Sequence, residues 1–290
     1  MGARTGLTIY EGQFDASDGY LDFAAIGPPG QMVRRALDEA RRSISSPDRP
    51  ITDILDPMAD TAKASIARLL GTDREHATYV SATSEGLSHV AFGLMESGGN
   101  VVVPSLEFAA NRYPWLRVES VGGPKVRLVE PEQGRITPDL LAAAIDADTR
   151  AVSVSLVDYA TGFRADIEAI ADVVGNALLV VDAIQGLGAM RVALDGADMI
   201  VAGGQKWLRA GFGAGVMAVS DRLLEVVEPT LTGWWIVSFR MPETDPVVTA
   251  ERLAIEGFFV SPRAQKVRVS PHASTPMHAI EGFLEVLDGA

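Results

Sequence analysis

Residues 177–215 read ALLVVDAIQGLGAMRVALDGADMIVAGGQKWLRAGFGAG, and this stretch decides the fold of the chain. Two short apolar runs, at 178–181 and 199–202, are each followed at once by polar residues and glycine, a pattern typical of buried strands. Asp182 ends the first strand, and Lys206 lies just past the second. Because ligands of an open parallel sheet bind beyond the carboxyl ends of its strands, both side chains are expected at one site.

A carboxylate and an amine at one site have a well-defined chemical use. A lysine flanked by glycines can form a Schiff base with an aldehyde cofactor, and an opposed carboxylate can keep the ring nitrogen of pyridoxal phosphate protonated. The alternative, for an arbitrary Asp and Lys, is a salt bridge at a strand end. The residues around Asp182 and Lys206 favour the cofactor.

Three motifs resemble the class V aminotransferase family, which includes cysteine desulfurases, kynureninase and isopenicillin N epimerase. They are DAIQ at 182–185, GGQKW at 203–207 and GFGAG at 211–215. The resemblance implies that Lys206 carries pyridoxal phosphate, that Asp182 faces the pyridine nitrogen and that Gln185 bonds the ring hydroxyl. Gln205 stands where relatives commonly have a histidine that supports the ring, and it is assigned to the cofactor site on that basis.

Strand and helix patterns alternate along the chain, which is the signature of a doubly wound α/β domain. The resemblance makes this the fold type I of pyridoxal-phosphate enzymes, with a mostly parallel sheet and a shortened α+β small domain. We expect an N-terminal arm and substrate-edge segment at 1–30, a large cofactor-binding domain at 31–233 and a small domain at 234–290. Expected helices include 31–43 and a helix from Asp56-Pro57 to Gly71, and expected strands include 78–80, 101–103, 125–129, 151–156, 214–219 and 258–260.

A phosphate site is expected where the strand at 78–80 leads into a helix. A helix N-terminus presents unpaired amides and a partial positive charge, and hydroxyl residues with a glycine complete a phosphate seat. Thr83 and Ser84 fall on the positions that surround the cofactor phosphate in the resembled family. The alternative is a plain Ser/Thr helix cap with Glu85 in the first turn.

Two further residues are assigned by resemblance. Phe108 stands where the family places an aromatic ring on the cofactor, often a histidine; an ordinary core position is the alternative for this phenylalanine. Arg268, in the run VRVS at 267–270, matches the arginine that clamps the substrate carboxylate through a planar bidentate contact. A surface ion pair is the alternative for Arg268. No histidine cluster suggests a metal site.

Composition limits the function classes. The chain has 290 residues, of which 47% are hydrophobic, and a net charge of −13, which argues against nucleic acid because phosphates need a basic face. It has no cysteine, so it cannot itself accept sulfur as a persulfide in the way a cysteine desulfurase does. No apolar run approaches the roughly 20 residues that span a bilayer, and the start lacks a signal-peptide core, so we expect a cytoplasmic protein.

The C-terminal part departs from the family. The run TLTGWW at 230–235 and the run IVSFR at 236–240 resemble pieces that a long stretch separates in relatives, which suggests an internal deletion. The stretch in relatives holds a loop that reaches the cofactor phosphate of the partner subunit, and by resemblance we expect a homodimer.

These observations lead to one main function and its rivals. We expect a pyridoxal-phosphate enzyme that acts on an amino acid, an aminotransferase or a carbon-sulfur or β-lyase. The alternatives are an amino-acid epimerase of the same family and a non-catalytic remnant of the fold. A nicotinamide enzyme is disfavoured, because Arg191 occupies the third glycine position of a dinucleotide loop beginning at Gly186.

Overall fold

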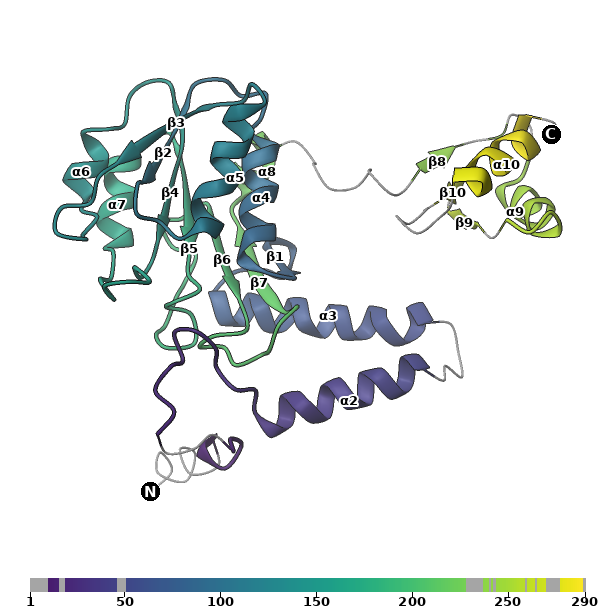
Figure 1. Ribbon diagram of the computed structural model, residues 1–290, viewed down its shortest axis with the longest axis horizontal. Coiled ribbons are helices and arrows are strands. Elements are labelled where there is room, and N and C mark those ends of the chain that lie inside the picture. The colour runs from purple at the N-terminus through teal and green to yellow at the C-terminus, as the bar shows by residue number, and fades with distance from the viewer. Residues whose placement is uncertain are drawn as a thin grey trace. The chain divides into compact units, whose positions relative to one another are not determined.

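The computed structural model describes residues 10–15, 19–45, 51–227, 237–239, 241, 244–258, 260–263, 265–269 and 277–288. The chain divides into two compact units, Met1–Glu228 and Pro229–Ala290 (Figure 1). Helices α2 to α8 and strands β1 to β7 belong to the larger unit, and the remaining elements belong to the smaller one.

A seven-stranded sheet forms the centre of the larger unit, in the order β1-β7-β6-β5-β4-β2-β3. The pairs that link β3, β2, β4, β5 and β6 are parallel, whereas β7 runs antiparallel to both β6 and β1. This mostly parallel sheet confirms the predicted α/β class. The strands are β1 Ala77–Val80, β2 Asn100–Pro104, β3 Lys125–Val129, β4 Thr149–Ser155, β5 Leu178–Asp182, β6 Met199–Gly203 and β7 Gly215–Val219.

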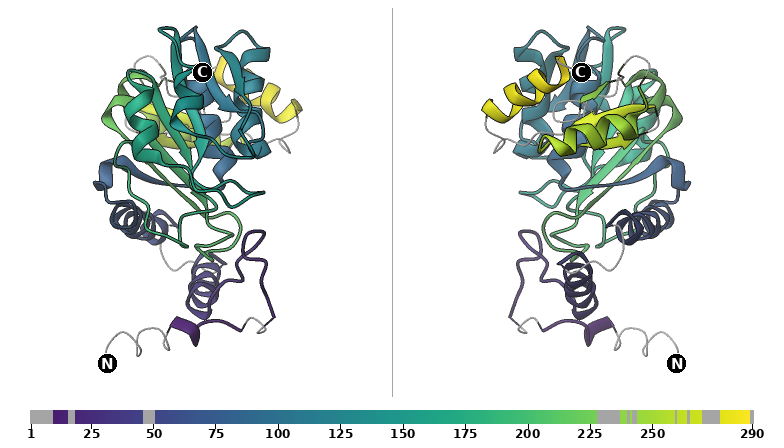
Figure 2. Two further views of the ribbon diagram at one scale, coloured as in Figure 1. Left: turned by 90° about the vertical axis from the view of Figure 1, so that its left-hand side faces the viewer. Right: turned by 90° about the vertical axis from the view of Figure 1, so that its right-hand side faces the viewer.

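Helices cover both faces of this sheet (Figures 1 and 2). Residues of α3, α6 and α7 share one buried apolar cluster, and residues of α4, α5 and α8 share the other. Successive strand residues point to opposite faces, so Val102 joins the first cluster while Val101 and Val103 join the second. The helices are α2 Gln31–Ser45, α3 Ile51–Leu70, α4 Thr83–Gly93, α5 Ala109–Ser120, α6 Pro138–Ala142, α7 Ile167–Val174 and α8 Asp221–Val226.

Most element positions agree with the sequence patterns, but the predicted start of α3 is wrong. The helix begins at Ile51, so Pro57 lies inside it rather than in its first turn. Ile54, before the proline, is buried, and this apolar contact extends the helix upstream of the Asp56-Pro57 start signal. Gly71 follows the helix at the predicted end, and its φ of 66° is the left-handed conformation typical of a helix stop.

The smaller unit contains a three-stranded antiparallel sheet and two helices. Its strands are β8 Val237–Phe239, β9 Ser261–Arg263 and β10 Lys266–Val269, in the order β8-β10-β9, and its helices are α9 Pro246–Ile255 and α10 Met277–Asp288. The strand predicted at 258–260 is wrong, because Phe258 donates its backbone N–H to the carbonyl of Leu253 and completes the end of α9. Gly257 adopts a left-handed φ of 88° there, as such helix ends require.

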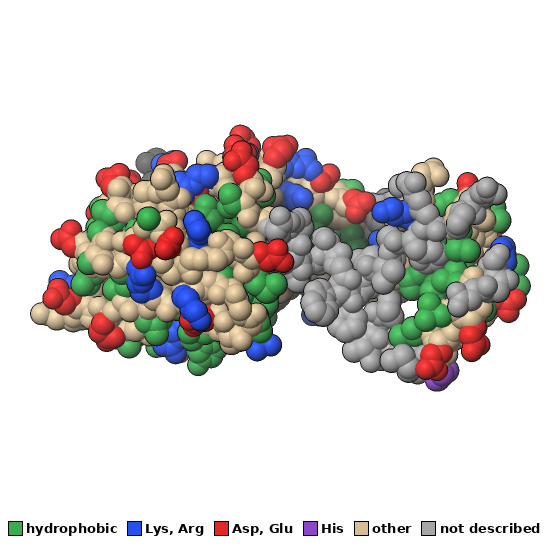
Figure 3. Space-filling model, turned by 90° about the horizontal axis from the view of Figure 1, so that it is seen from above, with side chains coloured by type: hydrophobic (Ala, Val, Ile, Leu, Met, Phe, Trp, Pro, Cys, Tyr) green, Lys and Arg blue, Asp and Glu red, His purple; other side chains and the backbone are tan. Residues whose placement is uncertain are grey.

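Several sequence features fall outside the described residues. These are the TLTGWW run at 230–235, which bears on the suggested deletion, and Ser270, the last residue of the VRVS run. Within the described part of the chain, no helix is both long and apolar enough to cross a membrane. On the face drawn in Figure 3, acidic side chains of the larger unit are interspersed with basic ones.

Candidate active site

Asp182 is the last residue of β5 and lies at the carboxyl edge of the sheet. It pairs in register with Ser155 of β4 on one side and with Val201 of β6 on the other. Its side chain is only 2% exposed, and its Oδ1 accepts a hydrogen bond of 2.9 Å from the backbone N–H of Ile184. The strand pattern therefore buries a carboxylate among backbone groups, where charge is poorly solvated.

The environment of Asp182 favours its protonated form. Burial raises the pKa of this carboxyl to about 7, and the negative charge of Glu107 adds to the rise, while the Ile184 N–H and the Lys206 ammonium oppose it. Neither Lys206 nor any other cation of the described chain forms an ion pair with Asp182. The simple salt bridge that was the alternative interpretation is therefore not formed.

Lys206 lies three residues after β6, in a loop that returns to β7. Backbone bonds close the loop: the N–H of Gly204 donates to the carbonyl of Ala214 at 2.6 Å, and that of Ala210 donates to Gly204 at 2.7 Å. A side chain at Gly204 would lie 2.6 Å from the Ala214 carbonyl, so this position requires glycine. Burial lowers the pKa of Lys206, against the opposing charge of Asp182. More of the amine is consequently neutral and nucleophilic at a given pH.

The Phe108 ring lies beside the lysine amine. Lys206 Nζ is 5.7 Å from the ring centroid, and the ring of Tyr159 meets Phe108 edge-on at 5.3 Å. Phe108 is 48% exposed, so the alternative of an ordinary core residue is wrong. It precedes α5 and follows β2, at the same edge of the sheet as Asp182.

The N-terminus of α4 is attached to the end of β6. Thr83 is buried, and its Oγ1 accepts a 2.8 Å hydrogen bond from the N–H of Gly203, three residues before Lys206. Ser84 is exposed at the same helix end. A plain Ser/Thr cap is wrong, because the N-cap is Ala82, which gives no side-chain cap. Glu85 instead accepts a hydrogen bond from the backbone N–H of Ser81.

Both glutamines assigned to the cofactor site contact neighbouring chain segments. Gln185 is 8% exposed; its Nε2 donates to the carbonyl of Ala24 at 3.0 Å, and its Oε1 accepts from Trp207 Nε1 at 2.9 Å. The Gln205 side chain folds back over Gly203, where an added Cβ would lie 2.4 Å from Gln205 Oε1. The Gln185 side chain would therefore make its predicted bond to a ring hydroxyl in addition to its bonds to Ala24 and Trp207.

Part of the N-terminal segment, for which a place at the substrate edge was expected, packs against the lysine loop. The N–H of Gly27 donates to the carbonyl of Gln205 at 2.8 Å, and Arg209 Nε donates to the carbonyl of Pro28 at 2.8 Å. The rings of Phe23 and Trp207 stack with their centroids 6.1 Å apart. These contacts flank Lys206 on both sides in the sequence and restrict the loop that carries it.

Glu107 is a further polar residue of this edge that the sequence analysis did not assign. Its carboxylate accepts a 2.7 Å hydrogen bond from the N–H of Ser155, the residue that pairs with Asp182, and a second bond from Ser155 Oγ. Burial raises the pKa of Glu107, while Ser155 and Asn111 oppose the rise. The signal in the sequence was weak, because nothing local distinguishes this glutamate from a solvated one.

Arg268 belongs to the smaller unit, on β10. Its neighbour Val267 is 1% exposed and packs within that unit, and successive strand residues point to opposite faces, so Arg268 faces away from Val267. The Arg268 Nε is buried and has no hydrogen-bond partner among the described residues. Its assignment to a substrate carboxylate stays a prediction.

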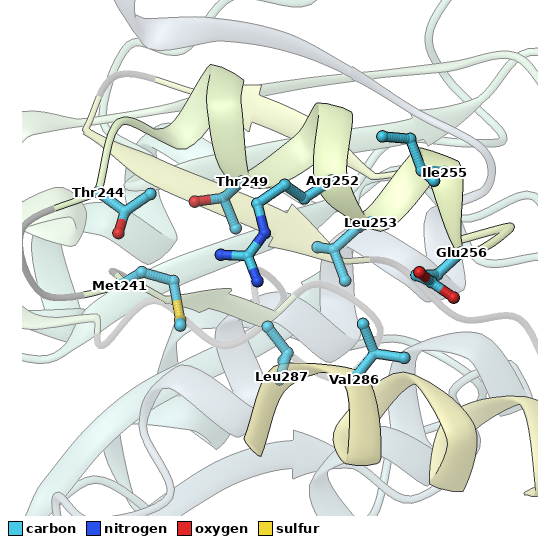
Figure 4. A pocket seen from close by; sticks show the side chains of 9 residues that line it. All are labelled: Met241, Thr244, Thr249, Arg252, Leu253, Ile255, Glu256, Val286 and Leu287. Atoms are coloured by element: carbon cyan, nitrogen blue, oxygen red, sulfur yellow. The ribbon is translucent and has the colours of Figure 1, made fainter. Parts of the chain in front are cut away.

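A separate hollow of about 430 Å³ lies in the smaller unit (Figure 4). The side chain of Arg252 projects from α9 into this hollow, towards Leu287 of α10 and Met241. None of the residues assigned to the cofactor lines it.

A match to a protein-family model decides the family of the chain. The model for aminotransferase class-V matches residues 21–244. The chain belongs to the class-V aminotransferase family. The resemblance drawn from the motifs around Asp182 and Lys206 is thereby confirmed.

Curated relatives of this class-V chain include two proteins named probable cysteine desulfurase. The one from Methanothermobacter thermautotrophicus is 32% identical over 224 residues, which cover 74% of this chain and 56% of the relative. The one from Aeropyrum pernix is 33% identical over 234 residues, which cover 76% of this chain and 56% of the relative. The class-V chain thus spans little more than half the length of these relatives.

Solved structures share the fold of this class-V chain. The apo cysteine desulfurase from Thermococcus onnurineus superposes with a TM-score of 0.66 at 19% identity, covering 93% of this chain and 94% of that one. The cysteine desulfurase CsdA from Escherichia coli gives 0.67 at 17% identity, covering 97% of each chain. A structure described as C-DES with glycine covalently linked to its pyridoxal-phosphate cofactor gives 0.71 at 13% identity, covering 96% and 99%.

Membership of the class-V family indicates pyridoxal phosphate as the cofactor, and the residues at the sheet edge fit this group. Asp182 is a buried carboxylate, and no cation of the described chain forms an ion pair with it. A protonated ring nitrogen would supply the missing positive charge. Lys206 supplies an amine of lowered pKa. The N-terminus of α4, fixed to β6 through Thr83, suits a phosphate.

Proposed function

We propose that this chain binds pyridoxal phosphate through Lys206 and acts on an amino acid by cleaving a carbon-sulfur bond. The observation that carries the proposal is the meeting of Asp182 and Lys206, from two adjacent strand ends, at one edge of the sheet. The named relatives, two probable cysteine desulfurases, support the substrate class. Because the chain spans 56% of those relatives, this activity is a proposal for the whole protein.

Each residue has a stated task in the proposal. When bound, pyridoxal phosphate supplies an electron sink for negative charge that develops at the substrate α carbon. Lys206 Nζ accepts the α proton, a role that the lowered pKa of this amine favours. Asp182 would hold the ring-nitrogen proton and Phe108 would lie against the ring. Thr83, Ser84, Gln185 and Gln205 would hold the phosphate and the ring. Arg268 would bind the substrate carboxylate.

The absent cysteine separates two ways of releasing sulfur. A cysteine desulfurase passes sulfur to its own cysteine as a persulfide, and this chain of 290 residues has no cysteine. A β-elimination needs no such acceptor: the α proton leaves, the carbon-sulfur bond breaks and the thiolate departs as sulfide. Water then converts the remaining enamine into a keto acid and ammonia, which balances the reaction. Phe108 also cannot shuttle a proton as a histidine would.

The first experiment is the visible absorption spectrum of the full chain mixed with pyridoxal phosphate, beside Lys206→Ala and the control Lys125→Ala. Lys125 is a solvent-exposed lysine on β3. We expect a band in the parent and in Lys125→Ala, no band in Lys206→Ala, and borohydride label on Lys206 by peptide mass. A folded parent without a band would instead favour the non-catalytic remnant.

The products of an amino-acid screen separate the remaining reactions. Sulfide with pyruvate from cysteine would support the lyase. A new amino acid formed with an added keto acid would favour the aminotransferase, and loss of optical activity alone would favour the epimerase. We also propose a homodimer in the cytoplasm; light scattering that gives a monomer mass would exclude the dimer at the concentration used.

A further inference from the structure

Glu107 is fixed beside Asp182 by the ends of two strands. Its carboxylate accepts hydrogen bonds from both the N–H and the Oγ of Ser155, the last residue of β4. Ser155 is the register partner of Asp182, and the carbonyl of Asp182 accepts the N–H of Leu156 at 2.8 Å. Ser155 therefore links Glu107, through two hydrogen bonds, to Asp182, through strand pairing, although the two acids come from distant parts of the sequence.

The groups that face these two carboxylates are few. Glu107 is next to the Ser155 hydroxyl, the Asn111 side chain and the charge of Asp158, and Asp182 is next to Glu107, Lys206 and the Ile184 N–H. Asp158 is held in place by its own turn, since its Oδ1 accepts from the N–H of Ala160 and the N–H and Oγ1 of Thr161. Among the described residues, no acidic or histidine cluster of three could hold a metal ion.

A small cavity lies beside Glu107. It measures about 20 Å³, room for one water molecule, and its lining includes Glu107, Ser155, Asp158 and Phe163. A water molecule there would have polar partners in Glu107, Asp158 and Ser155 and would give Glu107 a route for proton exchange. Such a route distinguishes a titrating residue from a sealed structural one.

Glu107 also adjoins the lysine amine through the next residue. Phe108 follows it directly in the chain, and the Phe108 ring lies 5.7 Å from Lys206 Nζ. The two hydrogen bonds to Ser155 therefore fix the backbone from which the ring projects. If Glu107 had a purely structural role, its hydrogen bonds would only join the segment after β2 to the end of β4.

We propose that Glu107 is a positioning residue of the candidate site: held beside Asp182 by Ser155, its charge controls the protonation of the carboxylate that faces the cofactor ring. The relevance to catalysis rests on the proposed function, but the coupling of the two carboxylates does not. Burial is the larger cause of the raised pKa of Asp182, and the negative charge of Glu107 adds to it. When Asp182 is ionised beside a protonated ring nitrogen, the charge of Glu107 stabilises the same proton.

The test measures Asp182 directly. The full chain, freed of cofactor, is labelled with ¹³C at the aspartate carboxyls, and Asp182→Asn identifies the Asp182 signal in a pH titration by NMR. Glu107→Gln keeps the size of the side chain and removes its charge. We expect the Asp182 midpoint to fall by about one pH unit, the size of one like-charge interaction at short range.

Glu130→Gln is the matched control. Glu130 also accepts a serine hydroxyl bond, from Ser105, after the neighbouring strand β3. Its substitution is expected to leave the Asp182 midpoint unchanged. If Glu107→Gln fails to fold, Ser155→Ala replaces it: loss of the hydroxyl donor raises the pKa of Glu107, removes part of its charge and lowers the Asp182 midpoint in the same direction, by less.

The outcomes separate the inference from the proposed function. A folded Glu107→Gln variant with an unchanged Asp182 midpoint overturns the inference, whether or not the parent binds pyridoxal phosphate. If the Asp182 midpoint falls in Glu107→Gln but the parent gives no cofactor band, the inference is supported and the proposed function is overturned. A lowered midpoint together with a band whose pH dependence shifts by the same amount supports both, because fixation of the backbone alone would not move either titration.

Discussion

Lys206 Nζ lies 5.7 Å from the centroid of the Phe108 ring, although 98 positions of sequence separate them. The contact joins the loop after β6 to the start of α5. An apolar ring beside an amine reduces the access of water to the ammonium form, which agrees with the lowered pKa of Lys206. The reactivity of the lysine therefore depends on a residue outside its own motif.

Removal of the Phe108 ring is expected to raise the pKa of Lys206 towards that of an exposed lysine. In Phe108→Ala, water reaches the amine, so the pKa of Lys206 rises towards its usual value. The chain has only Lys63, Lys125, Lys206 and Lys266, so ¹³C reductive methylation and NMR titration can resolve each one. Phe212→Ala, at a ring that is 75% exposed, is the control and should leave the titration unchanged. An unchanged Lys206 in Phe108→Ala would contradict the role given to the ring.

Asp182 should make the cofactor-free chain less stable as the pH rises. Its folded pKa, about 7, is above the unfolded value of 3.8, so ionisation disfavours the folded state. This penalty is absent below the unfolded pKa and grows until the pH passes the folded pKa. Asp182→Asn should therefore stabilise the chain at pH 8, on the order of 2 kcal/mol, and little at pH 4.

Thermal unfolding of the larger unit at both pH values measures this difference. Asp172→Asn is the control, because Asp172 is exposed on α7 and its substitution should give no pH-dependent gain. A gain of Asp182→Asn that is equal at pH 4 and pH 8 would mean that the charge of Asp182 is not the cause.

Substitutions at Thr83 and Ser84 should differ in their effect on stability. Thr83→Val leaves the buried N–H of Gly203 without its acceptor, which is expected to cost about 1 to 3 kcal/mol in unfolding free energy. Ser84→Ala, at an exposed position, should leave stability within about 0.5 kcal/mol. Urea unfolding of both variants measures the contrast, and equal losses would argue against it.

Ser84→Ala should also weaken the binding of pyridoxal phosphate while sparing pyridoxal, which lacks the phosphate. The loss of one hydrogen bond to a charged group is expected to reduce affinity roughly tenfold. Fluorescence titration with both ligands makes the comparison within one protein. An equal loss for pyridoxal and pyridoxal phosphate would remove Ser84 from the phosphate site.

Gly27→Ala should release the N-terminal segment from the lysine loop. A Cβ at residue 27 would lie 2.0 Å from the carbonyl oxygen of Lys206, far inside van der Waals contact. Limited proteolysis should then cut near residues 20–28 faster than in the parent. Gly19→Ala is the control, since a Cβ there meets no atom within 4 Å. Equal cleavage of both variants would show that the segment is not held as described.

The sequence by itself determined the elements and the two central residues. Alternation of strand and helix predicted the mostly parallel sheet, and the polar residues after two apolar runs predicted that Asp182 and Lys206 share an edge. These features are local, because the hydrophobic period, the helix caps and the strand ends each depend on residues that are close together in the sequence. The start of α3 and the strand at 258–260 were missed where tertiary burial and a helix end overrode the local signal.

Only the tertiary structure decided which distant groups meet at that edge. Glu107 lies beside Asp182, Gln185 bonds both Ala24 and Trp207, and Gly27 bonds the backbone next to Lys206. Each of these contacts depends on strand order and on a chain segment that returns from far away, and no local period encodes them. Burial then sets the charge of the site, since the same carboxylate and amine would titrate normally in water.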